Sequence, residues 1–129
     1  MKFVSTLLLI CAVSFSLSCS KSSNNSGTTP HDCDFSLPNI SAYANGTVKY
    51  DVTLTGTGKV TQIVYKTETA DSVVASPTIP FEVSLPVTSG TAISLSTKGN
   101  TSGGTISIQY AFTPTSGTSI TKNESSCGN

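Results

Sequence analysis

The chain has 129 residues and balances seven basic against seven acidic side chains, so it carries no net charge at neutral pH. All seven basic residues are lysines, and they form no patch or stripe along the sequence. Because clustered basic charge is the electrostatic footprint of nucleic-acid binding, we exclude nucleic acid as a partner.

Residues 1–18 have the layout of a secretory signal peptide. Lys2 precedes an apolar run from Phe3 to about Val13, and small side chains stand just before Cys19. The run is shorter than the ~20 apolar residues that a membrane-spanning helix needs, so we expect the segment to be removed.

The residues around Cys19 resemble a bacterial lipobox, in which the cysteine becomes the lipidated first residue of the mature protein. Leu17 stands two positions before Cys19, whereas lipoboxes usually place the leucine three positions before. Two alternatives stay open: ordinary cleavage near Ser18 that leaves Cys19 free, and processing at Cys11, which bulky side chains precede. We predict lipid on Cys19.

A polar run without aliphatic side chains extends from Ser20 to Pro30. Such a run cannot bury apolar surface, so we predict that residues 19–32 form a disordered tether behind a permanent lipid anchor. The expected location is the bacterial cell envelope, facing either the periplasm or the outer surface. In Bacteroidota, the signal that exports a lipoprotein to the surface often contains acidic residues just after the cysteine. Residues 20–24 contain no acidic residue, which favours the periplasm.

Cys33 and Cys127 are the cysteines that remain after processing, and they bracket everything that has folding potential. In an oxidising compartment we expect them to form a disulfide, which would close a long loop and contribute ~4–5 kcal/mol in the chain-entropy model. The alternative is a pair of free thiols, which is unusual in exported proteins.

Residues 46–55 alternate most cleanly between apolar and polar side chains, which predicts a strand with one buried and one wet face. The apolar face holds Val48, Tyr50, Val52 and Leu54. Gly56 to Gly58 has turn chemistry, and residues 60–67 begin a second strand with Ile63 and Tyr65 facing inward. We therefore predict a hairpin that residues 69–72 break.

Further strands are predicted downstream. Residues 78–87 contain Pro80 and Pro86, which cannot donate ladder hydrogen bonds and so indicate an edge strand. Residues 92–97 form a short strand, residues 103–113 a central strand, and residues 119–122 are the candidate for a last one. The side chains expected to face inward are Ile79, Phe81, Val83 and Leu85 in residues 78–87, Ile93 and Leu95 in residues 92–97, and Ile106, Ile108, Tyr110 and Phe112 in residues 103–113.

No window supports a helix. About seven short strands within residues 33–129 predict an all-β fold, an immunoglobulin-like β-sandwich. Antibody-type domains pack a Trp against an inter-sheet disulfide, and this chain has no Trp. Its cysteine pair would instead join the two ends of the domain.

Titratable groups are too few and too dispersed to predict catalysis. His31, the only histidine, lies in or beside the tether, and we interpret it as a solvated linker residue. The segment from His31 to Asp34 contains metal-ligand types. Adjacent residues of an extended chain point to alternating sides, however, and Cys33 is expected in the disulfide. We predict no enzymatic activity, no metal and no cofactor.

Two surface features are weaker candidates. Tyr43, before the Asn45–Gly46 turn, is the aromatic residue most suited to stack on a ligand, although core packing is favoured for the aromatic residues as a group. The triplet Asp71–Ser72–Val73 lies in a predicted loop and resembles the O-glycosylation acceptor of exported Bacteroidota proteins, with a chance match in a Ser-rich chain as the alternative.

A set of short patterns resembles the mycobacterial small membrane protein family, MmpS. They are Val48 to Gly58, Val60 to Tyr65, Ile79–Pro80–Phe81, Ile93 to Gly99 and Gly103 to Tyr110. Members usually have Trp where Phe81 stands and a transmembrane anchor. The resemblance implies an extracytoplasmic β-sandwich that assists a large envelope transporter without catalysis. A surface glycan-binding or adhesion module is the alternative.

Overall fold

The computed structural model describes residues 29–117 and 119–128. Over these residues the chain forms strands and no helix: β1 (His31–Ser36), β2 (Ile40–Ser41), β3 (Gly46–Lys66), β4 (Asp71–Ala75), β5 (Phe81–Val87), β6 (Ala92–Ile93), β7 (Leu95–Pro114) and β8 (Thr121–Gly128). A search of the same residues finds no helix that could cross a membrane. The predicted all-β class is confirmed. The predicted signal peptide and Cys19 lie outside the described residues.

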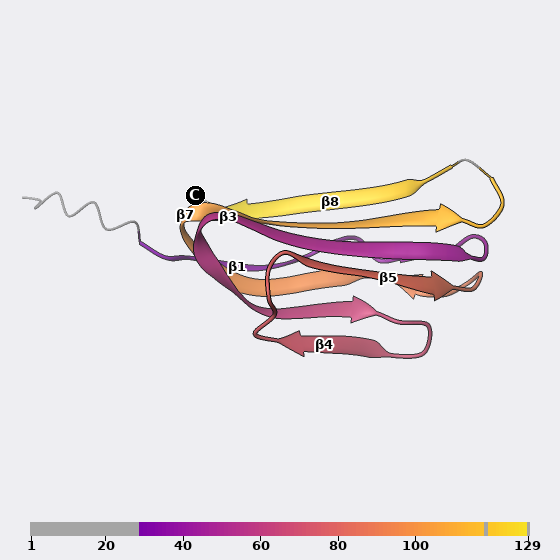
Figure 1. The fold of residues 1–129 in the computed structure, drawn as a ribbon, viewed down its shortest axis with the longest axis horizontal. Coiled ribbons are helices and arrows are strands. Elements are labelled where there is room, and N and C mark those ends of the chain that lie inside the picture. The colour runs from indigo at the N-terminus through magenta and orange to yellow at the C-terminus, as the bar shows by residue number, and fades with distance from the viewer. Residues whose placement is uncertain (1–28, 118, 129) are drawn as a thin grey trace, which may run out of the picture.

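Two long strands organise the molecule (Figure 1). β3 has 21 residues and β7 has 20, and they pair antiparallel along most of their length. The first half of β3 also pairs with β5, and the second half of β7 pairs with β8. The remaining halves pair with β4 and β1. One sheet thus supplies two layers, with strand orders β5-β3-β7-β8 and β4-β3-β7-β1.

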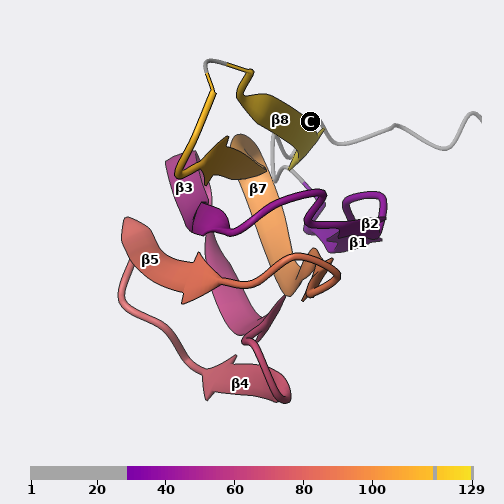
Figure 2. The ribbon, with the colours of Figure 1, turned by 90° about the vertical axis from the view of Figure 1, so that its right-hand side faces the viewer.

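The two layers face each other because both long strands fold back on themselves. Tyr50 and Tyr65 lie in opposite halves of β3, and their ring centroids are 5.3 Å apart. In a straight strand, 15 residues would separate them by ~50 Å. The Tyr50 hydroxyl also donates a hydrogen bond of 2.9 Å to the Lys66 carbonyl. Viewed along the strands, β5 and β8 lie on one side of the molecule and β1 and β4 on the other (Figure 2).

The predicted hairpin over residues 46–67 is wrong. The segment Gly56 to Gly58 turns β3 from one layer into the other, but the two halves of β3 do not pair with each other, and the register with β7 shifts there by a β-bulge. Gly56 has a φ of 71°, which a glycine adopts without a steric penalty. Because β7 runs alongside β3 through the bend, it satisfies backbone groups that a hairpin would have paired within β3.

The core lies between the layers and contains the inward faces that alternation predicted. Tyr50, Tyr110 and Phe112 are the largest of its fully buried side chains. Around them lie Val48, Val52, Ile63, Ile93, Leu95, Ile106 and Ile108, all at most 1% exposed. The short β2–β6 pair joins Ile40 to Ile93 and contributes to this core.

The predicted edge, central and last strands are confirmed with shifted bounds, whereas the predicted short strand at residues 92–97 is divided between β6 and the start of β7. β5 pairs only with β3 and is an edge strand, as its prolines indicated. The last strand is longer than predicted and begins at Thr121. β1, β2 and β4 were not predicted, and the expectation of short strands fails for β3 and β7, each of which contributes to both layers. The immunoglobulin-like connectivity stays a prediction.

Candidate functional site

The outer face of the β3, β7 and β8 layer carries a polar hollow of about 680 Å³. Its lining comes from three adjacent strands: Asp51 and Thr53 of β3, Ser107, Ile108 and Gln109 of β7, and Glu124, Ser125 and Ser126 of β8. Seven of these eight residues have a hydroxyl, amide or carboxylate side chain. We call this surface the polar hollow.

The sheet register arranges the lining in two cross-strand rows. Asp51 is paired with Gln109, which is paired with Glu124. One step toward the bend, Thr53 is paired with Ser107, which is paired with Ser126. Directly opposed side chains on one face of a sheet lie ~4.5–5.5 Å apart, so each row presents closely spaced polar groups. A carboxylate–amide–carboxylate row therefore runs beside a row of hydroxyls.

Lysines pair with the carboxylates on this face. Lys49 contacts Asp51 at 3.4 Å and Glu82 of neighbouring β5 at 2.9 Å, and Lys122 contacts Glu124 at 2.7 Å. The hydrogen bond from Lys49, with its charge, holds the pKa of Glu82 below its ordinary value. The same hydrogen bond raises the pKa of Lys49. The Glu82 carboxylate is therefore held in the charged form.

The polar hollow can recognise a hydrophilic ligand through many hydrogen bonds. Hydroxyls both donate and accept, an amide presents one acceptor and two donor hydrogens, and carboxylates accept only. Tyr43, the predicted stacking residue, does not line it. That side chain is 56% exposed, but its ring edge packs on Phe112 and its hydroxyl donates to the Ser119 carbonyl at 2.7 Å.

Sequence reasoning did not find the polar hollow as a site. It placed Asp51 and Thr53 on a wet strand face, but Gln109 and Glu124 join them only through long-range pairing. The available signal was the outward series of hydroxyl and amide residues in residues 103–113, opposite the buried Ile106 and Ile108.

A second constellation lies at the disulfide between Cys33 and Cys127. The predicted bridge is present in the structure, with a Cα–Cα distance of 5.8 Å and a sequence separation of 94. It joins β1 of one layer to β8 of the other, near the bend. Cys33 is buried, whereas Cys127 is partly exposed.

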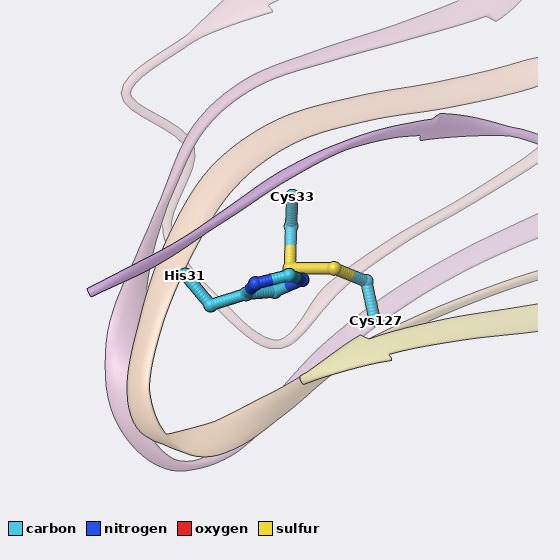
Figure 3. Close-up of side chains that lie close together, drawn as sticks. All are labelled: His31, Cys33 and Cys127. Atoms are coloured by element: carbon cyan, nitrogen blue, oxygen red, sulfur yellow. A yellow bond between two sulfur atoms is a disulfide. The ribbon is translucent and has the colours of Figure 1, made fainter. Parts of the chain in front are cut away.

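His31 stands against this disulfide rather than in a tether (Figure 3). It is the first residue of β1 and is paired with Thr101 of β7. Residues two apart on a strand share a face, so His31 points to the same side as Cys33. A ring nitrogen of His31 and the two sulfurs all lie within 4.8 Å of one another. The interpretation of His31 as a linker residue is therefore corrected, and the strand begins two residues before the predicted domain boundary.

Ser72, the predicted O-glycosylation residue, lies in edge strand β4 and not in a loop. It is half-buried and paired with Tyr65, while the adjacent Asp71 forms an ion pair of 2.9 Å with Lys66. Glycosylation of Ser72 stays a prediction, as does lipidation of Cys19, which lies outside the described residues.

Comparison of the chain with models of protein families, with curated proteins and with solved structures finds no match.

Proposed function

We propose that this chain is a lipid-anchored, extracytoplasmic domain that binds an envelope or surface glycan without changing it chemically. The observation that carries the proposal is the polar hollow. Three adjacent strands present hydroxyl, amide and carboxylate groups there in two regular rows. A sugar presents closely spaced hydroxyls that both donate and accept, and the hydroxyl, amide and carboxylate side chains of this lining offer acceptors and donors to them.

The charge state of this face supports binding rather than hydrolysis. A general acid for glycoside cleavage needs a carboxyl group with a raised pKa. Here Lys49 lowers the pKa of Glu82, and Lys122 contacts Glu124 at 2.7 Å. Glu82 is exposed and therefore lacks the desolvated setting that a general acid needs, and the exposed Glu124 is ion-paired.

The distribution of apolar surface also favours a hydrophilic ligand. The exposed large apolar side chains among the described residues are Tyr43, Val73 and Ile120; Val73 lies in β4, whereas Tyr43 is hydrogen-bonded to Ser119, which precedes Ile120. Protein-binding sites usually present such side chains as a continuous patch. Edge strand β5 contains Pro86, which hinders pairing with a foreign strand.

The test measures retention of the purified protein by envelope polysaccharides. We expect Gln109→Ala to weaken binding about tenfold, which corresponds to about 1.4 kcal/mol, because the amide centres the row between Asp51 and Glu124. Gln62→Ala is the matched control: Gln62 is also half-buried, but it is paired with Lys98 in the other layer. Absence of retention, or equal loss in both variants, would contradict the proposal.

The anchor has a separate test. Cys19→Ala should abolish labelling by fatty acid and release the protein from the membrane fraction, because the thioether-linked lipid is lost. Cys11→Ala is the control and should leave labelling intact. A Cys19→Ala protein that is still labelled and membrane-bound would overturn the lipid assignment.

A second candidate function is an accessory role in an envelope transport complex, as the MmpS resemblance implies. One observation favours it: Val73 on edge strand β4 is 58% exposed and is paired with Val64, so apolar surface adjoins a free strand edge. The test is a pull-down from detergent-solubilised membranes. Recovery of a transporter component with the wild-type protein and with Ala75→Lys, but not with Val73→Lys, would support this function. Recovery of polysaccharide alone would count against it.

A further inference from the structure

We infer that reduction of the Cys33–Cys127 disulfide converts this corner of the fold into a three-ligand site for Zn²⁺, formed by His31, Cys33 and Cys127. The inference is independent of the polar hollow and of glycan binding. It rests on the placement of one imidazole and two sulfurs, whose ligand atoms lie within 4.8 Å of one another.

Strand pairing with β7 positions all three residues, in addition to the disulfide. β1 is paired with β7 from His31 to Ser36, and β8 is paired with the same β7 from Thr121 to Gly128. Cys33 is opposite Gly99, and Cys127 is opposite Ile106. Cleavage of the S–S bond therefore leaves both cysteines attached to one central strand.

The distances suit a tetrahedral zinc ion. Zn–S bonds of about 2.3 Å and Zn–N bonds of about 2.0–2.1 Å place two thiolates about 3.8 Å apart and a thiolate and an imidazole about 3.5 Å apart. The Cα–Cα distance of 5.8 Å allows the sulfurs to reach this geometry through side-chain rotation.

The surroundings also fit a zinc site. Two thiolates and one imidazole are ligands that zinc prefers, and three protein ligands leave a fourth position for water. His31 is exposed and Cys127 is partly exposed, so an ion can enter from solvent. Asp34 contacts Lys98 at 3.5 Å on the outer face of the sheet, and it is not a member of the cluster.

The chemistry balances with a phosphine as the reductant. The phosphine and one water reduce the disulfide to two thiols, the S–S bond breaks, and the phosphine is oxidised to its oxide. Zn²⁺ then binds the two cysteine sulfurs and the neutral imidazole, and the two thiol protons pass to the solvent. In the cell, a dithiol protein could supply the same two electrons and two protons by thiol–disulfide exchange.

The experiment titrates the phosphine-reduced, purified protein with Co²⁺ under anaerobic conditions and then adds Zn²⁺. We expect thiolate-to-cobalt charge-transfer absorption that saturates at one ion per chain and disappears when zinc displaces cobalt. The oxidised protein should show no such absorption, because its sulfurs are not thiolates.

Two variants test the role of the imidazole. His31→Ala should weaken cobalt affinity at least about tenfold, since even outer-shell partners of a metal contribute about 10–100-fold. Asp34→Asn, which changes the neighbour of Cys33 on the opposite face, should bind like wild type. Circular dichroism follows the fold of each reduced protein with and without metal.

Three results would overturn the inference. The first is absence of charge-transfer absorption in the reduced protein, whether it is folded or unfolded. The second is equal cobalt affinity of His31→Ala and wild type. The third is equal cobalt binding by the oxidised and the reduced protein. If reduction unfolds the protein, zinc should restore the fold of wild type but not of His31→Ala, and this result would support the inference.

Discussion

The tyrosine hydroxyls show how single polar groups are accommodated in an apolar core. The Tyr110 hydroxyl donates to the Pro38 carbonyl at 2.8 Å and accepts from the Asn123 amide at 2.8 Å. Burial raises the pKa of Tyr50 and of Tyr110, so both hydroxyls stay protonated and can donate. The core therefore includes polar groups without leaving them unpaired.

These hydrogen bonds predict an order of stability losses. Tyr110→Phe leaves two partners without a hydrogen bond and should cost about 1–3 kcal/mol, whereas Tyr50→Phe should cost about 0.5–1.5 kcal/mol. Tyr43→Phe is the control and should change stability by less than about 0.5 kcal/mol, because its hydrogen bond is exposed. Urea denaturation measures all three, and equal losses would contradict the assignment.

The Lys49–Glu82 ion pair predicts a defined pH dependence. Because the folded-state pKa of Glu82 lies below its ordinary value of 4.5, its contribution to stability is present above that value and is lost as pH falls through the folded pKa. The pKa of Lys49 is raised above 10.5, so its contribution is present below that value and is lost as pH rises through the folded pKa.

A carboxyl NMR titration tests the pair directly. In Lys49→Ala the midpoint of Glu82 should move up toward 4.5. Lys59→Ala is the control, because Lys59 forms no ion pair with any described residue. An unchanged midpoint in Lys49→Ala would show that another group sets the pKa of Glu82.

The bend in β3 and β7 is the element on which the two-layer fold depends, and glycines let the backbones approach there. A Cβ on Gly56 would meet backbone atoms of the opposite strand, the Gly103 carbonyl oxygen and, at 2.8 Å, the Gly104 Cα. A Cβ on Gly103 would meet nothing within 4 Å. Both glycines have positive φ angles, 71° and 94°.

Gly56 and Gly103 both have a positive φ, but only at Gly56 would a Cβ overlap with other atoms, so the two positions separate backbone strain from steric overlap. Gly103→Ala should lose about 1–2 kcal/mol of stability from its positive φ alone. Gly56→Ala should lose a further ~1–3 kcal/mol, because the backbone atoms that it meets cannot rotate away. Denaturant unfolding of both variants measures the difference, and equal losses would mean that the two strands are not in close contact at the bend.

Prediction from the sequence succeeded where the signal was local. The alternation of Val48, Tyr50 and Val52 identified the buried face because strand geometry fixes which side chains share a face. Gly56 to Gly58 was ambiguous, since the same residues suit a hairpin turn and a bulge. The distant strand β7 decides between them, and no local pattern reveals that pairing.

The candidate sites also combine features that the local sequence shows with features that depend on pairing between distant strands. The disulfide followed from cysteine counting, and the His31–Cys33 spacing already contained the shared strand face. What the sequence could not show is that β7 pairs with residues 31–36 and so makes them a strand. The polar hollow needed three strands in register, of which Asp51 and Glu124 are far apart in the chain.

At the scale of the whole molecule, the disulfide joins the outer strands of two layers across 94 positions of sequence. The double variant Cys33→Ala/Cys127→Ala should lose about 4–5 kcal/mol of stability, because its unfolded chain is no longer closed into a loop. Denaturation of the oxidised wild type and the variant, both with a chelator present, gives the difference. A loss below about 1 kcal/mol would contradict a stabilising role.

The same bridge determines how the domain responds to mechanical load. His31 begins the first strand and Gly128 ends the last one, and Cys33 and Cys127 lie just inside them. Tension between the chain ends therefore passes from one sulfur to the other and bypasses the layers. A domain of this design can be pulled at its ends without unravelling, until a reductant breaks the disulfide.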